Sequence, residues 1–153
     1  MRSSVAALFI LTVLAAGCSQ HVQPRLASSR PPAAAPSSAS AIPGRPAAAV
    51  WNLRAGLNVA ALSCKGRGRV PVRGPFGQVL SRHRALLAAA YSAEQHRQGG
   101  NFDRFQTRLY NRFSNQRQPA QFCRDAASVT RRAAAMDSPT LALNAGSLLR
   151  ELR

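Results

Sequence analysis

The side chains of this sequence that could carry out chemistry are three cysteines and three histidines. A cysteine nucleophile needs a reduced thiol beside a base such as histidine, and a structural zinc site usually has two ligands within a few residues of each other. Cys18 and His21 lie near the N-terminus, before the predicted helices. The ligands or catalytic groups of either site would therefore have to come from four residues far apart in sequence: Cys64, His83, His96 and Cys123. The spacing favours neither site, so we expect no metal and no cofactor.

Acidic side chains are equally poorly placed for catalysis. They number only 5 and are spread singly over the second half of the chain, a pattern that predicts surface ion-pair partners rather than an acid–base pair. They are Glu94, Asp103, Asp125, Asp137 and Glu151. The glycine-rich segment over 65–77 lacks the Gly-Lys-Ser/Thr ending of a phosphate-binding P-loop. We therefore expect no enzymatic activity.

The remaining cysteine, Cys18, follows a stretch that is typical of an export signal. Arg2 precedes an uncharged, mainly apolar run over 5–14, and small residues follow it at 15–17. The run is shorter than the about 20 apolar residues that a membrane-spanning helix needs. An ordinary signal peptide would leave Cys18 incidental, whereas a lipoprotein signal would make it the acylated residue.

The end of this stretch, Ala-Gly-Cys at 16–18, resembles a bacterial lipobox, in which the cysteine becomes the lipid-bearing N-terminus. Ala15 departs from the pattern, because a larger aliphatic residue is commoner there and Leu14 lies one position too early. Ser19 follows the cysteine in place of the aspartate that commonly keeps lipoproteins in the inner membrane. The resemblance implies an exported protein that is anchored in the membrane through lipid on Cys18, in the outer membrane and facing the periplasm.

If Cys18 is acylated, Cys64 and Cys123 remain as an even pair in an oxidising compartment. We expect a disulfide between them. The alternative bridge between Cys18 and Cys64 would leave Cys123 unpaired and would have to span the Pro/Ala/Ser-rich segment that follows Cys18.

Basic residues dominate the charge, with 21 Lys and Arg against 5 acidic residues and a net charge of +16. The abundance of Ala and Arg, with a single lysine, is typical of a GC-rich genome, so part of this charge reflects composition. Two groups could nevertheless bind anions. The first lies in the segment between two predicted helices and comprises Lys65, Arg67, Arg69 and Arg73. The second has helical i, i+4, i+8 spacing and comprises Arg104, Arg108 and Arg112.

Both groups could instead be solvated charges whose aliphatic stems cover apolar surface. If they are functional, arginine suits phosphate, and the partners would be anionic envelope polymers or lipopolysaccharide. The export signal argues against nucleic acid as a physiological partner.

The elements that must position these residues are helices. Apolar spacing predicts helices over 47–63, 78–98, 102–116 and 119–136, with a loop at 65–77, and Pro139 begins a short final helix. The third helix is the clearest, because four large apolar residues form one stripe: Phe102, Phe105, Leu109 and Phe113. The sequence predicts an all-α fold of four or five helices.

The domain organisation follows from these assignments. We expect a lipoprotein-type signal peptide over 1–17, a lipidated N-terminus and disordered Pro/Ala/Ser-rich tether over 18–46, a disulfide-linked helical domain over 47–136, and a loosely docked C-terminal helix over 137–153.

The segment over 50–125 resembles a group of uncharacterised exported helical proteins of alphaproteobacteria, especially sphingomonads. The resemblance rests on a Trp-x-x-Arg-Ala-Gly-Leu-Asn-Val-Ala-Ala-Leu-x-Cys start and on a second cysteine after Tyr-Asn-x-Phe. The matching positions are Trp51, Arg54, Gly56, Asn58, Cys64, Tyr110, Asn111, Phe113 and Cys123. It implies the same domain boundary and the same disulfide, but no activity. The basic glycine-rich segment departs from the group.

The function that these features favour is that of a basic envelope lipoprotein with a structural or interaction role at the membrane surface. The alternative is a secreted helical module that binds a small ligand or a protein and has no enzymatic activity.

Overall fold

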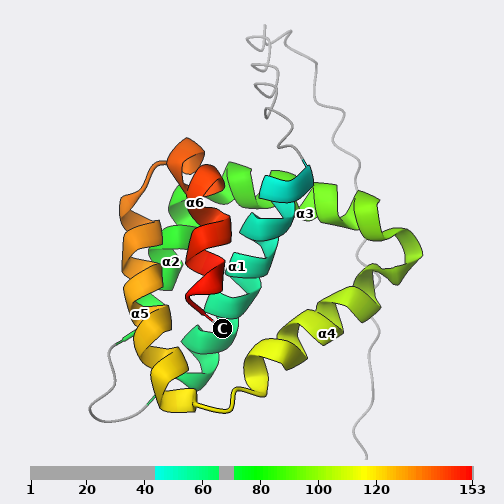
Figure 1. Cartoon of the computed structure of the whole chain (residues 1–153). Coiled ribbons are helices and arrows are strands. Elements are labelled where there is room, and N and C mark those ends of the chain that lie inside the picture. The colour runs from blue at the N-terminus through cyan, green and yellow to red at the C-terminus, as the bar shows by residue number, and fades with distance from the viewer. Residues whose placement is uncertain (1–43, 66–70, 153) are drawn as a thin grey trace, which may run out of the picture. The chain divides into compact units, whose positions relative to one another are not determined.

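The structure is a computed structural model that describes residues 44–65 and 71–152. Every regular element in these ranges is helical, which confirms the predicted all-α class. The elements are α1 (Gly44–Ser63), α2 (Arg73–Arg82), α3 (Arg84–Gln98), the 3-10 helix η1 (Gly99–Asn101), α4 (Phe102–Ser114), α5 (Pro119–Ala135) and α6 (Ser138–Arg150) (Figure 1). The predicted signal peptide over 1–17 and the tether up to 43 lie outside the described residues.

Helix α1 is the centre of the described domain and packs against each of the other five α-helices. In Figure 1 it runs between α5 and α6 on one side and α3 and α4 on the other. Its sequence explains this position, because apolar residues occur all round the helix rather than on one stripe. The buried residues include Val50, Leu53, Leu57 and Val59. The predicted start of the domain at 47 is three residues late, since α1 begins at Gly44.

The single helix predicted over 78–98 is two helices in the structure. Helix α2 already begins at Arg73, inside the predicted loop, because Pro75 falls in its first turn, where a missing backbone N–H costs nothing. The chain then bends at His83, whose φ of −105° and ψ of 24° are not helical. The His83 ring is fully buried, and its contacts with the α5–α6 connection fix the bend.

The sequence predicts a loosely docked C-terminal helix, and this prediction is wrong. Helix α6 lies along α1 (Figure 1), and Leu141, Leu148 and Leu149 are buried against the core. Its start also differs by one residue from the prediction. Helix α6 begins at Ser138 rather than at Pro139, and Asp137 caps its first turn, accepting a hydrogen bond from the Thr140 backbone N–H at 2.8 Å.

No helix of the described part of the chain combines the length and the apolar character needed to cross a bilayer.

Candidate functional site

The disulfide ties the C-terminal end of α1 to the first turns of α5. Cys64 and Cys123 are bridged, with Cα atoms 5.5 Å apart, and both residues are buried. This is the pairing that the sequence predicts. The bridge removes both thiols from nucleophilic or metal chemistry. Cys18, the predicted lipidation site, lies outside the described residues.

His83 and Glu94 are two titratable residues that the sequence does not predict to be buried, and both are interior groups. Nε2 of His83 donates to the Ala133 carbonyl at 3.0 Å, and in the neutral ring Nδ1 then accepts from the Ser138 hydroxyl at 2.9 Å. Both ring nitrogens are thereby occupied in a structural contact. In the described ranges no group of three or more His, Cys, Asp and Glu residues is arranged to hold a metal ion.

Glu94, expected at the surface, is only 1% exposed. Arg97 donates two hydrogen bonds to its carboxylate, at 2.9 Å from Nε and 2.6 Å from a terminal guanidinium nitrogen, and the Gln98 side chain donates a third at 3.4 Å. The bond with Glu94 raises the pKa of Arg97 above its ordinary value, against the effect of burial. The i, i+3 spacing of Glu94 and Arg97 is the signal that could have revealed the pair.

The first predicted basic group is only partly described. Lys65 is exposed just after α1, and Arg73 is exposed at the first residue of α2, whereas Arg67 and Arg69 lie outside the described residues. Figure 1 shows α2 and α4 on opposite sides of α1. Arg73 therefore lies on a different side of α1 from the second group.

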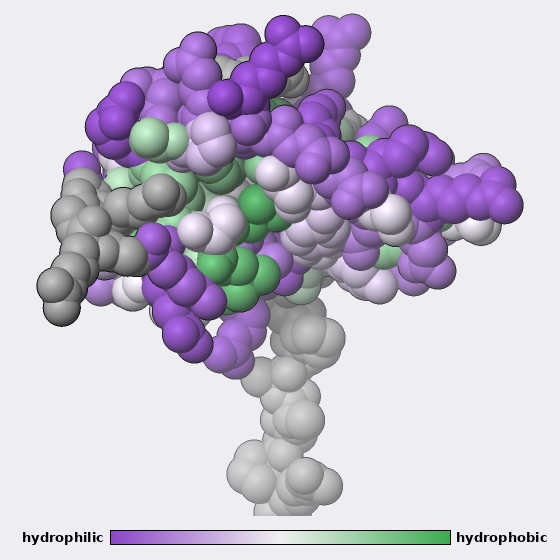
Figure 2. All heavy atoms as spheres, turned by 90° about the horizontal axis from the view of Figure 1, so that it is seen from below, coloured by the Kyte–Doolittle hydropathy of each residue, from purple (hydrophilic) through white to green (hydrophobic). Residues whose placement is uncertain are grey.

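The second basic group forms one exposed face of α4. Arg104, Arg108 and Arg112 are all exposed, and we call them the arginine ladder. Within the described ranges, the ion pairs between basic and acidic side chains are Arg97 with Glu94 and Arg132 with Glu151. None of the ladder arginines therefore has an acidic partner in that part of the chain. Seen from below, hydrophilic side chains dominate the side of the domain on which α4 lies (Figure 2). The ladder therefore presents three uncompensated positive charges to solvent.

Aromatic rings of α4 lie beside one arginine of the ladder, Arg112, and beside Arg97 of α3. The Arg112 guanidinium carbon lies 5.4 Å from the centroid of the Phe113 ring, and that of Arg97 lies 5.9 Å from the centroid of Phe105. Phe113 is buried and stacks on Phe122, with ring centroids 6.4 Å apart. The contact of Arg112 with Phe113 connects the basic face of α4 to the core, and the contact of Arg97 with Phe105 connects α3 to α4.

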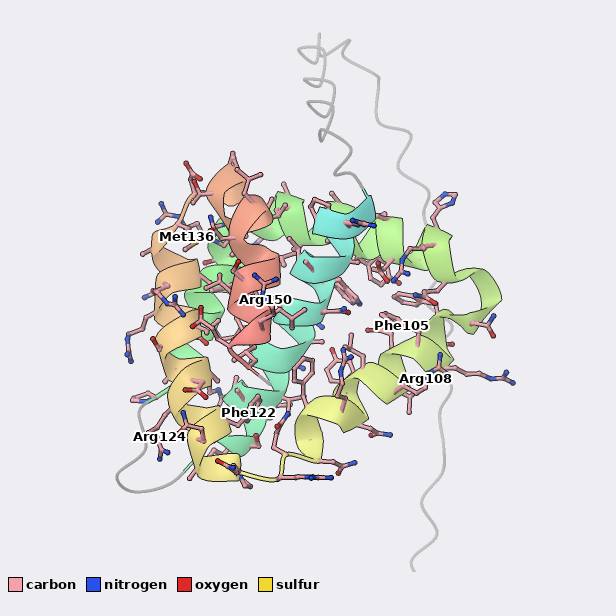
Figure 3. All side chains as sticks on the ribbon, viewed as in Figure 1. Phe105, Arg108, Phe122, Arg124, Met136 and Arg150 are labelled. Carbon is pink, nitrogen blue, oxygen red and sulfur yellow. A yellow bond between two sulfur atoms is a disulfide. The ribbon has the colours of Figure 1, made fainter. Side chains whose placement is uncertain are left out.

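A shallow hollow of about 300 Å³ opens on α4 at this face. Its lining residues are Phe105, Arg108, Leu109 and Arg112. Phe105 and Arg108 project from neighbouring turns of α4 (Figure 3). Cationic and apolar side chains thus meet in one depression.

A second hollow, of about 280 Å³, lies where α4 connects to α5. It is mostly polar, and two of its lining side chains, Gln121 and Asp125, are hydrogen-bonded to each other. Arg124 beside it donates to the Gln121 side-chain oxygen, and Gln121 donates to Asp125 at 2.7 Å. Arg117 is the one cationic residue of its lining, whereas the lining of the hollow on α4 has two.

No protein-family model, curated protein or solved structure matches this chain. The resemblance to exported helical proteins of alphaproteobacteria therefore stays a prediction.

Proposed function

We propose that this protein is an exported lipoprotein, anchored through Cys18 in the outer membrane and facing the periplasm, with an interaction role at the membrane surface. Its helical domain binds anionic groups of the envelope through the arginine ladder of α4. The observation that carries this proposal is the absence of an acidic partner for Arg104, Arg108 and Arg112 among the described residues.

The strength of such an interaction follows from electrostatics. A basic side chain near an anionic membrane surface contributes about 1 kcal/mol at physiological ionic strength. Three ladder arginines therefore contribute about 3 kcal/mol, or on the order of a hundredfold in affinity. Arg97 adds less, because Glu94 neutralises it.

The position of the proposed anchor supports the same function. Cys18 is separated from the start of α1 at Gly44 by a segment that reaches at most about 90 Å when fully extended. An anchor at this distance keeps the domain close to the membrane and raises the effective concentration of the ladder at that surface.

The ladder is tested with the chain that begins at Ser19. All packing described above lies within the unit Ala35–Arg153, so this chain keeps the complete domain and lacks the acylation site. We expect it to co-sediment with vesicles that contain anionic phospholipid, and the triple substitution of Arg104, Arg108 and Arg112 by Gln to weaken binding about a hundredfold or more.

A matched control removes the same charge elsewhere. Arg84, Arg124 and Arg131 are exposed on α3 and α5, and their triple substitution by Gln should weaken binding far less. Equal losses for both triple variants would mean that net charge alone drives adsorption. Binding that does not change between about 50 mM and about 500 mM salt would contradict an electrostatic contact altogether.

The anchor is tested in the full-length protein expressed in a bacterium with two membranes. We expect incorporation of labelled palmitate, lost in Cys18→Ser and kept in the double variant Cys64→Ser/Cys123→Ser. Absence of labelling from the unsubstituted protein would favour the secreted binding module instead. Labelling that persists in Cys18→Ser would place the acyl group on another residue and contradict the Cys18 anchor.

A further inference from the structure

The hollow on α4 has a composition that the ladder alone does not explain. Its four lining residues have i, i+3, i+4 and i+7 spacing, so they form one continuous face of the helix. Two are apolar and two are cationic. Arg104, the third ladder residue, is not part of the lining.

The apolar floor of the hollow is held in place by the core. Leu109 is only 3% exposed, and Phe105 is partly buried and packs against the core cluster. The Arg97 guanidinium lies over the Phe105 ring, and Glu94 holds Arg97 by two hydrogen bonds. The floor is therefore formed before any ligand arrives.

The two cations are placed to share one anion. Arg108 and Arg112 are one helical turn apart, a spacing that puts side chains on neighbouring positions, about 5–6 Å between Cβ atoms. Arg112 is restricted by its contact with the Phe113 ring. Guanidinium groups bind phosphate oxygens in a bidentate, planar manner, and a group that is already ordered loses less entropy on binding.

We infer that this hollow seats the phosphodiester headgroup of a single anionic phospholipid in a bilayer. Arg108 and Arg112 bind its phosphate, the partly exposed Phe105 contacts the glycerol and the first acyl methylenes, and the buried Leu109 supports this apolar floor. This inference rests on the proposed function and refines it, because it replaces a uniform basic face with one lipid-binding position.

A phospholipid fits this site better than a nucleic acid does. In a lipid, the phosphate lies at the boundary with hydrocarbon, just as the two arginines lie beside an apolar floor. Binding of single-stranded nucleic acid needs aromatic faces on which bases can stack. Arg97 already covers one face of Phe105, the only aromatic side chain of the lining.

Single substitutions in the chain beginning at Ser19 distinguish a headgroup site in the hollow from a general electrostatic contact of the ladder. Arg104→Gln should weaken binding to phosphatidylglycerol-containing vesicles about fivefold, as expected for one surface charge. Arg108→Gln and Arg112→Gln should each weaken it by about 20-fold or more. Arg108→Lys should still lose several-fold because lysine cannot bind bidentately, whereas Arg104→Lys should be neutral.

The outcomes distinguish the inference from the proposed function. Equal effects of all three Gln variants, with neutral Lys variants, would overturn the headgroup site and leave the general electrostatic contact standing. No effect of any variant would overturn both. Far-UV circular dichroism and thermal unfolding should show that every variant folds, since the three side chains are exposed.

Two competitors test the class and source of the ligand. Soluble glycerophosphate has the phosphate but no acyl chain, so it should compete poorly with vesicles. A short single-stranded oligonucleotide should compete through charge alone, with the same loss for Arg104→Gln as for Arg108→Gln. Strong competition by glycerophosphate would overturn the bilayer lipid as ligand, and oligonucleotide binding that depends selectively on Arg108 and Arg112 would assign the hollow to nucleic acid.

Discussion

A Cβ atom at Gly56 would lie 2.9 Å from Cε1 of Phe113, so α1 and α4 approach each other closely through a glycine. The same Cβ would lie 3.1 Å from Cδ1 of Leu152, beyond α6. Phe113 is buried and stacks on Phe122, so its ring has little room to move. Gly56 therefore determines where α4, and with it the arginine ladder, can sit on the central helix.

Gly56→Ala should destabilise the protein despite the better helix propensity of alanine. Propensity would favour alanine by about 1 kcal/mol, but overpacking a core costs about 1–3 kcal/mol. We expect a net loss of about 1 kcal/mol in the free energy of unfolding, measured by urea denaturation. Gly77→Ala in α2 is the matched control, because nothing lies within 4 Å of its added Cβ. It should stabilise the protein, and a gain at both positions would contradict the close approach.

The Cys64–Cys123 disulfide should contribute much of the stability of this small domain. The two residues are 59 positions apart, and closing a loop of that length stabilises a fold by about 4 kcal/mol in the chain-entropy account. The double variant Cys64→Ala/Cys123→Ala should lose about this amount in urea denaturation. Reductant should lower the stability of the unsubstituted protein and leave the double variant unchanged. Two free thiols in the oxidised, unfolded protein by alkylation would contradict the pairing.

His83 should be needed for the bend between α2 and α3. Its replacement by Ala removes two hydrogen bonds, leaves the Ala133 carbonyl without its donor and opens a cavity, so we expect a loss of about 3 kcal/mol. His96→Ala is the matched control, since His96 is exposed, and should change stability by less than about 0.5 kcal/mol. NMR of the imidazole nitrogens should find the proton on Nε2. A proton on Nδ1 in the neutral ring would contradict the bond to the Ala133 carbonyl.

Asp137 should make the stability of α6 depend on acidity. Hydrogen bonds from Thr140 hold the pKa of Asp137 below its ordinary value. The bond from the Thr140 side chain has the larger effect, and the bond from its backbone N–H has the smaller one. Stability from a depressed carboxylate pKa is present above the pKa of the unfolded state, about 4, and is lost as the pH falls through the folded-state pKa. Thermal unfolding temperature should therefore fall between about pH 5 and about pH 2.

Asp137→Asn isolates this contribution, because asparagine caps a helix without titrating. The variant should lose less stability than the unsubstituted protein over the same pH range, although other carboxylates titrate in both. An identical pH dependence of the two proteins would show that the Asp137 carboxylate does not stabilise the folded state.

The sequence alone was sufficient to predict features that depend on the spacing of residues along a helix and on the number of cysteines. The stripe of Phe102, Leu109 and Phe113 predicts α4, because residues three to four positions apart share a helical face, and all three are buried. The even pair of cysteines that remains after Cys18 predicts the disulfide that the structure contains. The i, i+4, i+8 spacing likewise places the three ladder arginines on one face.

Only the tertiary structure decided the features that depend on what a helix packs against. Glu94 and His83 are polar in sequence and buried in the fold, because partners on a neighbouring turn or on another helix satisfy their hydrogen bonds. The last helix was expected to dock loosely, yet its leucines complete the core around α1, whose apolar residues face every direction. The hollow on α4 also depends on tertiary packing. The sequence spacing places Arg108 and Arg112 on one face, but only packing against the core fixes the apolar floor beside them.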